Sequence, residues 1–235
     1  MEIKSEQLVN YFEVRHETYQ ALRHALHMTQ GVIAGGAARE AFLNKDFGSN
    51  DIDIYFPNHN LGELFFEVMY KSNRTSHYQY HDTVPNGYRA KNFRLNDGTK
   101  IQIIYDVHPT IKSIFSTFDF TCCQFAIKDD TLYYTPQAII DTMTKKLVAT
   151  NNQCIKDYRL IKYVLLKGFD PGILFDRFNE ILIKFIELKP TDEEIDYFIK
   201  GDYGVFRQVD SSFNFFVNEE LFIPRQLENW QIARF

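Results

Sequence analysis

The segment 32–56 constrains what this chain can fold into more than any other. It begins with an apolar run that ends in a double glycine, Gly35 and Gly36, and a short helix-forming stretch follows. Glycine lets a backbone approach a ligand closely, and the start of a helix offers N–H groups to a phosphate. This half of the segment therefore predicts a strand, a turn and a helix suited to binding phosphate.

The second half of the segment alternates acidic and apolar residues. Asp51 and Asp53 are each followed by an isoleucine. Because alternate side chains of a strand share a face, the two carboxylates point to one side and the isoleucines point into the core. Two close carboxylates repel each other unless a cation lies between them, and carboxylate oxygens suit a divalent metal. The segment therefore predicts a site for a metal and a nucleotide, with Mg²⁺ or Mn²⁺ as the cofactor.

Length and charge narrow the class of protein. The 235 residues allow one large domain, or a larger domain followed by a small one. The net charge of −5 and the pI of about 5.8 lie well below those of a broad nucleic-acid-binding surface, so any contact with nucleic acid is expected to be local. The three cysteines have no CxxC spacing, the first residues do not resemble a signal peptide, and no apolar run is long enough to span a membrane. We expect a cytoplasmic protein without a membrane contact.

Hydrophobic periodicity and turn residues divide the chain into two parts. We expect an α+β domain over 1–145 and a helical domain over 146–235. The predicted helices are 6–29, 37–43, 61–71, 109–115, 136–143, 153–167, 171–188, 191–200 and 225–234. The predicted strands are 32–34, 51–56, 76–80, 88–95, 100–105 and 132–134, together with a β-rich run over 118–127.

The order of glycines, Arg39, Glu40 and the two aspartates resembles a known motif. It is similar to the signature of the polymerase-β-like nucleotidyltransferase superfamily, and most similar to the head domain of class II CCA-adding tRNA nucleotidyltransferases and bacterial poly(A) polymerases. The resemblance implies a mixed β-sheet flanked by helices. It also implies that Asp51 and Asp53 hold the metal.

Two later segments resemble the same family in the same order. The segment 118–121 is similar to its Asp-Phe-Thr motif, and the basic helix 159–169 to the one that follows it. The resemblance implies nucleotide-binding roles for the two glycines and Arg39, and Arg39 could equally support Asp51 from behind instead of neutralising a phosphate. A third carboxylate would be Asp119, or alternatively Asp106. Arg159 and Lys162, with Lys156, would form a basic helix face toward the triphosphate or the acceptor.

The chain also departs from the family at defined positions. Thr117 and Phe118 replace a pair of arginines before the Asp-Phe-Thr motif, and Gln102 stands where the family carries an acid. The element that selects C and A is not recognisable, so CCA specificity is not implied.

The function that these features predict is transfer of a nucleoside monophosphate from an NTP to an acceptor hydroxyl. The leading acceptor is a tRNA or other RNA 3′ end. One alternative is a nucleotidyltransferase that modifies a protein or a small molecule, and another is a nucleotide-binding regulatory module without catalysis. The NTP and the oligomeric state are left open.

Overall fold

The computed structural model describes residues 1–7, 17–43, 51–72, 75–79, 89–105, 110–150, 155 and 157–187. The chain divides into two compact units, Met1–Met143 and Thr144–Phe235. That the chain has domains at 1–145 and 146–235 stays a prediction. Among the described residues, no helix is both long and apolar enough to cross a membrane.

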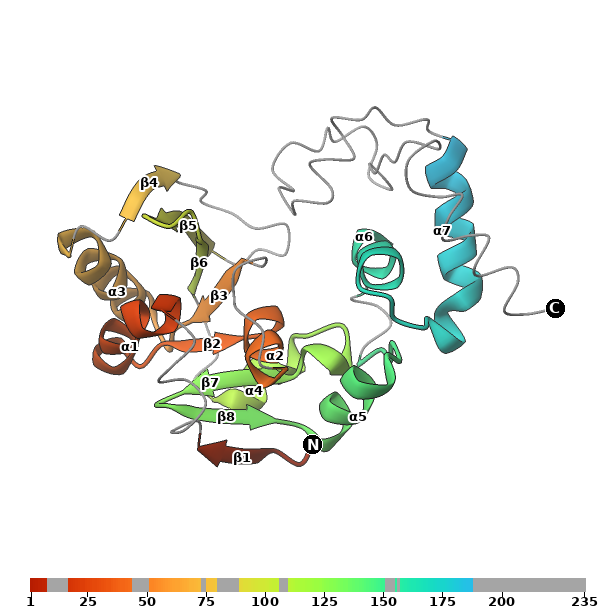
Figure 1. Cartoon of the computed structure of the whole chain (residues 1–235), viewed down its shortest axis with the longest axis horizontal. Coiled ribbons are helices and arrows are strands. Elements are labelled where there is room, and N and C mark those ends of the chain that lie inside the picture. The colour runs from red at the N-terminus through yellow and green to blue at the C-terminus, as the bar shows by residue number, and fades with distance from the viewer. Residues whose placement is uncertain are drawn as a thin grey trace. The chain divides into compact units, whose positions relative to one another are not determined.

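The first unit is built on a mixed sheet of eight strands (Figure 1). The strands lie in the order β1-β8-β7-β2-β3-β6-β5-β4, with β3 and β6 parallel and the other neighbours antiparallel. Their bounds are β1 Lys4–Gln7, β2 Val32–Ala34, β3 Ile52–Tyr55, β4 Thr75–Gln79, β5 Arg89–Leu95, β6 Lys100–Tyr105, β7 Phe125–Lys128 and β8 Thr131–Tyr134. A mixed sheet with flanking helices confirms the predicted α+β class.

Helices pack on both faces of this sheet. The bounds are α1 Glu17–Thr29, α2 Gly36–Phe42, α3 His59–Lys71, α4 Ile111–Ser116 and α5 Pro136–Thr144. The larger core takes residues from α1, α2, α3 and α5, and Ile52 and Ile54 of β3 are fully buried in it. The smaller core joins α4 to the other face of the sheet, where Tyr55 lies. Strand alternation therefore places Asp53 on the α4 face of the sheet.

The predicted helix 6–29 is wrong at its N-terminal end. Residues 4–7 form β1, an edge strand that pairs with β8, and Ser5 lies opposite Tyr133 instead of capping a helix. Backbone pairing with a distant strand outweighs the weak local preference of this polar segment. The helix begins by Glu17 and ends at Thr29, while residues 8–16 lie outside the described part. Gln30, with a φ of 56°, takes the left-handed position before Gly31.

The predicted β-rich run over 118–127 is only partly a strand. Thr121–Cys123 forms a 3₁₀ turn, and β7 begins at Phe125. The Cys123 N–H donates to the Phe120 carbonyl over 3.1 Å and the Gln124 N–H donates to the Thr121 carbonyl over 2.9 Å, so these backbone groups close the turn and are not used for strand pairing. Asp119 therefore lies in a bend before this turn instead of within a strand.

The expected start of α3 also shifts by two residues. Asn58, not Asn60, is the N-cap, because its side-chain oxygen accepts a hydrogen bond of 3.0 Å from the Leu61 N–H. The predicted turns at 96–98 and 129–130 are both present between antiparallel strands.

The described part of the second unit contains helices and one isolated β-bridge, between Lys146 and Asp170. α6 Asp157–Ile161 continues into a π-helical turn, Lys162–Leu166, and α7 spans Phe175–Glu187 after a short 3₁₀ turn. The chain leaves the π-helical turn through Gly168, whose φ of +66° suits glycine. The predicted helices 191–200 and 225–234 lie outside the described residues.

Candidate active site

The two aspartates of the DxD pair stand at the open beginning of β3. Asp51 is exposed and Asp53 is half-buried, whereas Tyr55 further along the same face is 9% exposed. The alternating isoleucines, Ile52 and Ile54, are fully buried on the opposite face. The expectation that the two carboxylates share one face is therefore confirmed. The end of the face that carries them is open to solvent, while its other end is covered by the smaller core.

The double glycine lies directly beside this pair. Gly35 has a φ of +81°, and a Cβ added there would lie 4.0 Å from Asp53 Oδ2. Its N–H donates to the Phe125 carbonyl over 2.9 Å, so Gly35 contributes its conformation to the turn while its amide is used by the sheet. Gly36 begins α2, and a Cβ there would meet no heavy atom within 4 Å. The start of α2 is therefore the backbone that a phosphate could approach next to Asp53.

Phe118 brings the later motif to the same place. Its ring would lie 3.6 Å from a Cβ at Gly35, and it packs edge-on against Tyr55 with ring centroids 6.3 Å apart. The first residue of the segment 118–121 therefore lies next to Gly35. The aromatic ring of Phe118 therefore occupies the position at which the related family carries an arginine.

Arg39 and Asp119 are both interior residues. Arg39 is 2% exposed and forms an ion pair of 3.0 Å with Glu40, while Asp119 is 5% exposed. Both act on the neighbouring thiol of Cys122: burial and the contact with Cys123 raise its pKa, Arg39 lowers it and Asp119 raises it. The two charges therefore lie around one buried thiol. A role for Asp119 at the metal and for Arg39 at a phosphate stays a prediction, and Asp106 lies outside the described residues.

Strand β6 adds two residues next to the aspartates. β3 and β6 run parallel with Asp53 opposite Gln102, so Lys100 and Gln102 face the same side of the sheet as Asp51 and Asp53. Lys100 Nζ lies 4.0 Å from Asp51 Oδ1. From the sequence we named Gln102, which stands where the family carries an acid, but missed Lys100. The alternation of polar and apolar residues over 100–103 indicates that Lys100 and Gln102 share one face of their strand. It does not indicate that this strand pairs with β3.

The oxygen donors gathered here suit a hard divalent cation. Carboxylate and amide oxygens are the side-chain ligands that Mg²⁺ takes in proteins, and Asp51, Asp53 and Gln102 provide both kinds. Within the described ranges, no group of three or more His, Cys, Asp or Glu residues could hold a metal ion. Among the described residues, the oxygen donors gathered here are therefore the two aspartates and the neutral amide of Gln102.

Arg159 and Lys162 belong to the second unit. Arg159 lies over the ring of Tyr163, 5.6 Å from its centroid, and Lys162 is half-buried at the start of the π-helical turn. Their role toward a nucleotide stays a prediction, and Lys156 lies outside the described residues.

Solved structures of CCA-adding enzymes share this fold. A Thermotoga maritima CCA-adding enzyme in complex with tRNA has a TM-score of 0.56 at 20% identity, over 72% of this chain and 43% of that chain. A CCA-adding enzyme in complex with ATP has a TM-score of 0.58 at 16% identity, over 80% and 52% of the two chains. The first unit thus has the fold of a polymerase-β-like nucleotidyltransferase head, as the motif predicted.

The sequence also matches one particular protein family. A family model described as "Gabija anti-defense 2 family protein" matches residues 2–145, and the chain belongs to that family. A curated relative named "Gabija anti-defense 2", from Bacillus phage SPbetaL7, is 32% identical over 133 residues, which is 52% of this chain and 30% of the relative. The match therefore covers less than a third of that relative's length.

Proposed function

We propose that this protein is a metal-dependent nucleotidyltransferase that moves a nucleoside monophosphate from an NTP to an acceptor hydroxyl. The observation that carries the proposal is the position of Asp53, whose carboxylate lies 4.0 Å from where a Cβ at Gly35 would be, at the start of α2. A pair of carboxylates beside a helix start suits a triphosphate and its cation. The resemblance to nucleotidyltransferase heads supports the same chemistry.

In this proposal Asp51 and Asp53 hold the divalent cation, which when bound neutralises phosphate charge and helps to activate the acceptor hydroxyl. The backbone at Gly36 faces the phosphates, and Phe118 excludes water from the side next to Tyr55. The acceptor oxygen forms a bond to the α-phosphorus, the bond to the bridging oxygen breaks, and pyrophosphate leaves. The hydroxyl proton passes to solvent. The contribution of the chain is to position the reactants and to balance charge.

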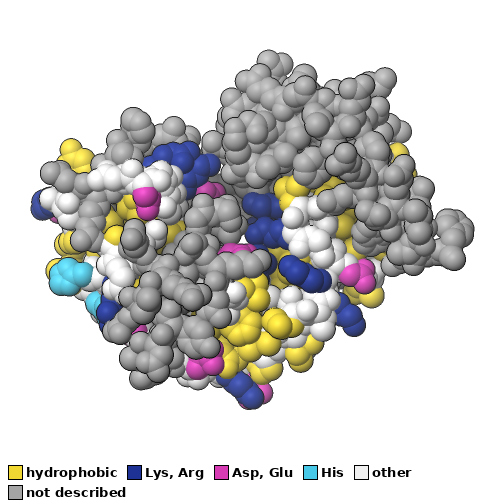
Figure 2. All heavy atoms as spheres, in the orientation of Figure 1, with side chains coloured by type: hydrophobic (Ala, Val, Ile, Leu, Met, Phe, Trp, Pro, Cys, Tyr) yellow, Lys and Arg dark blue, Asp and Glu magenta, His cyan; other side chains and the backbone are white. Residues whose placement is uncertain are grey.

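The leading acceptor is an RNA 3′ end, because one structural neighbour was solved with tRNA. The acidic pI and the Gabija anti-defense family favour a second candidate, transfer onto a protein, with a role in countering a bacterial defence. On the described part of the face in Figure 2, basic side chains are mixed with acidic and apolar ones, which suits a local contact with an acceptor.

The test is transfer of label from each of four α-³²P NTPs, with Mg²⁺ or Mn²⁺, to bulk tRNA and separately to a protein lysate. We expect label in one acceptor, with release of pyrophosphate. Asp51→Asn and Asp53→Asn should abolish the label, whereas Glu67→Gln, on an exposed carboxylate of α3, should leave it unchanged. NTP binding without transfer to either acceptor and without pyrophosphate release would show that the protein is a nucleotide-binding module without catalysis.

A further inference from the structure

The two residues of β6 beside the aspartates change the charge of the candidate cation site. Asp51 and Asp53 together carry two negative charges on one face of β3. Lys100 places a positive charge 4.0 Å from the first of them, and the residue opposite the second is the neutral Gln102. The four side chains of this patch therefore sum to a single negative charge.

Lys100 is held close enough to Asp51 to act as a local counter-ion. Its side chain is 25% exposed and that of Asp51 is 41% exposed, so the pair is only partly screened by water. A divalent cation that approached Asp51 would meet the ammonium group at short range. Because like charges repel, Lys100 lowers the affinity of this end of the site for a second cation.

Gln102 has a defined orientation next to Asp53. Its Nε2 donates a hydrogen bond of 3.0 Å to Asn92 Oδ1 on β5. Since the nitrogen and oxygen of one amide project in different directions, this bond turns Oε1 away from β5. Strand β6 lies between β5 and β3, so an oxygen directed away from Asn92 is suited to a cation at Asp53.

Resting on the proposed function, we propose that β6 makes this a site for one divalent cation. Asp51 and Asp53 bind that cation, with the amide oxygen of Gln102 as a neutral ligand. Lys100 offsets one of the two negative charges and takes the place of a second cation. Asn92 is a positioning residue that fixes the orientation of the Gln102 amide.

The test is titration of the full chain with Mn²⁺, followed by electron paramagnetic resonance, without a nucleotide. We expect one bound Mn²⁺ per chain. Lys100→Met and Gln102→Glu each add one unit of negative charge a few ångströms from the cation, and each should tighten Mn²⁺ binding about tenfold. The matched controls are Lys71→Met and Asn60→Asp on α3, which make the same charge changes at exposed positions and should leave Mn²⁺ binding unchanged.

The role of Asn92 is tested by a double-variant comparison. Asn92→Leu should weaken Mn²⁺ binding in the otherwise natural chain. It should have no effect in the Gln102→Glu background, because either oxygen of a carboxylate can bind the cation. A purely structural role for Asn92 would weaken binding in both backgrounds, and thermal unfolding of each variant checks that it is folded.

Two bound Mn²⁺ per natural chain, or unchanged affinity in both Lys100→Met and Gln102→Glu, would overturn the one-cation site. If nucleotidyl transfer is observed in that case, the proposed function is supported and the one-cation proposal is wrong. If instead the Mn²⁺ shifts occur as expected and no acceptor is labelled, the cation site stands and the proposed reaction is wrong.

Discussion

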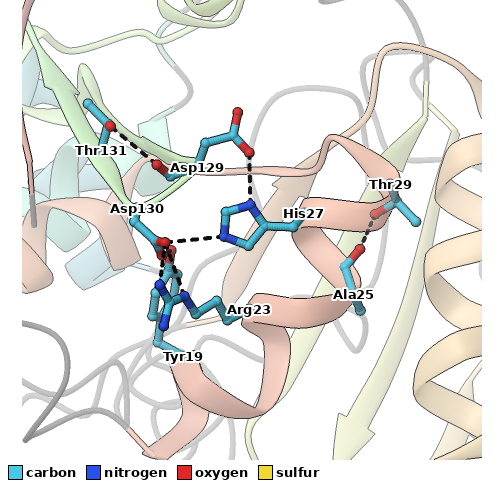
Figure 3. A network of polar contacts seen from close by, with 8 residues as sticks. All are labelled: Tyr19, Arg23, Ala25, His27, Thr29, Asp129, Asp130 and Thr131. Carbon is cyan, nitrogen blue, oxygen red and sulfur yellow. Dashed lines mark hydrogen bonds and ion pairs between the residues drawn. The ribbon is translucent and has the colours of Figure 1, made fainter. Parts of the chain in front are cut away.

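Arg23 on α1 donates hydrogen bonds of 3.1 Å from Nε and 2.6 Å from Nη2 to Asp130 Oδ2, in the turn between β7 and β8 (Figure 3). Tyr19 donates a hydroxyl bond of 2.8 Å to the same carboxylate, and the ring of His27 lies between Asp129 and Asp130. These contacts fasten α1 to a hairpin more than a hundred residues further along the chain. Both aspartates adopt positive φ, 48° and 57°, so the network also holds a turn that costs backbone energy.

Loss of this connection should destabilise the first unit. Arg23→Ala removes the two donors and leaves the partly buried Asp130 carboxylate with fewer partners, so we expect the free energy of unfolding to fall by about 1–2 kcal/mol. Urea unfolding followed by circular dichroism measures the change. The control is Lys71→Ala, which breaks an ion pair with Glu67 that is exposed on both sides and should cost less than about 0.5 kcal/mol. Equal losses in the two variants would contradict a structural role for the Arg23–Asp130 pair.

Stability should fall in acid partly because of Asp130. Burial raises the pKa of its carboxyl, but the hydrogen bonds from Arg23 and Tyr19 and the charges of Arg23 and His27 outweigh it, so the pKa lies below the ordinary 3.8. A carboxyl with a lowered folded-state pKa stabilises the fold above its unfolded-state pKa, and this contribution is lost as the pH falls through the folded-state value. We expect the decline below about pH 4 to be shallower in Asp130→Asn than in the natural chain.

Asp97 also contributes to the loss of stability below about pH 4. The Asp130→Asn variant should therefore still lose part of its stability in acid. The pKa of Asp97 is also lowered, because hydrogen bonds from Thr99 and Thr18 outweigh the effect of burial. Urea unfolding at several pH values between about 3 and 7 measures both slopes. Identical slopes in Asp130→Asn and the natural chain would show that Asp130 is not a source of the acid dependence.

The two glycines of the motif should respond differently to alanine. Gly35→Ala places a side chain at a φ of +81°, which should cost about 1–3 kcal/mol of stability. Gly36→Ala has open space around the new Cβ and lies in the first turn of α2, so thermal stability should be unchanged. If the backbone at Gly36 meets a phosphate, the same variant should bind NTP more weakly, as measured by calorimetry. Unchanged NTP affinity in Gly36→Ala would place the phosphate elsewhere.

Replacing Lys91 and replacing its ion-pair partner Glu63 should have unequal effects on stability, because Lys91 is buried and Glu63 is partly exposed. The Lys91 ammonium lies 2.8 Å from Glu63 Oε2 and 4.0 Å from the centre of the Phe66 ring, and the residue is 5% exposed. Glu63→Gln removes the negative charge that lies 2.8 Å from a buried cation and should cost about 1–3 kcal/mol. Lys91→Met keeps the aliphatic volume and leaves a carboxylate that can reach water, so it should cost less than about 1 kcal/mol. Urea unfolding of both variants measures the two losses of stability. A larger loss in Lys91→Met than in Glu63→Gln would contradict this prediction.

The features that were predicted correctly are those that neighbouring residues in the chain specify. The turn at 96–98, the start of α5 at Pro136 and the alternation around Asp53 all depend on residues that are close in the chain. The errors occurred where distant contacts compete with local preference. The polar residues 4–7 form a strand because they pair with the distant strand β8, and Asp119 lies in a bend because the backbone closes a 3₁₀ turn at Thr121–Cys123.

The sequence by itself determined the nucleotidyltransferase-like fold of the first unit and the position of its DxD pair. A double glycine before a short helix, followed by aspartates that alternate with isoleucines, specifies its own local geometry. Only the tertiary structure decided what stands beside those aspartates. Lys100 and Gln102 become their neighbours through the parallel pairing of β3 with β6. Alternation within each strand determines which of its side chains share a face, but which strand becomes the neighbour depends on the packing of segments that are far apart in the chain.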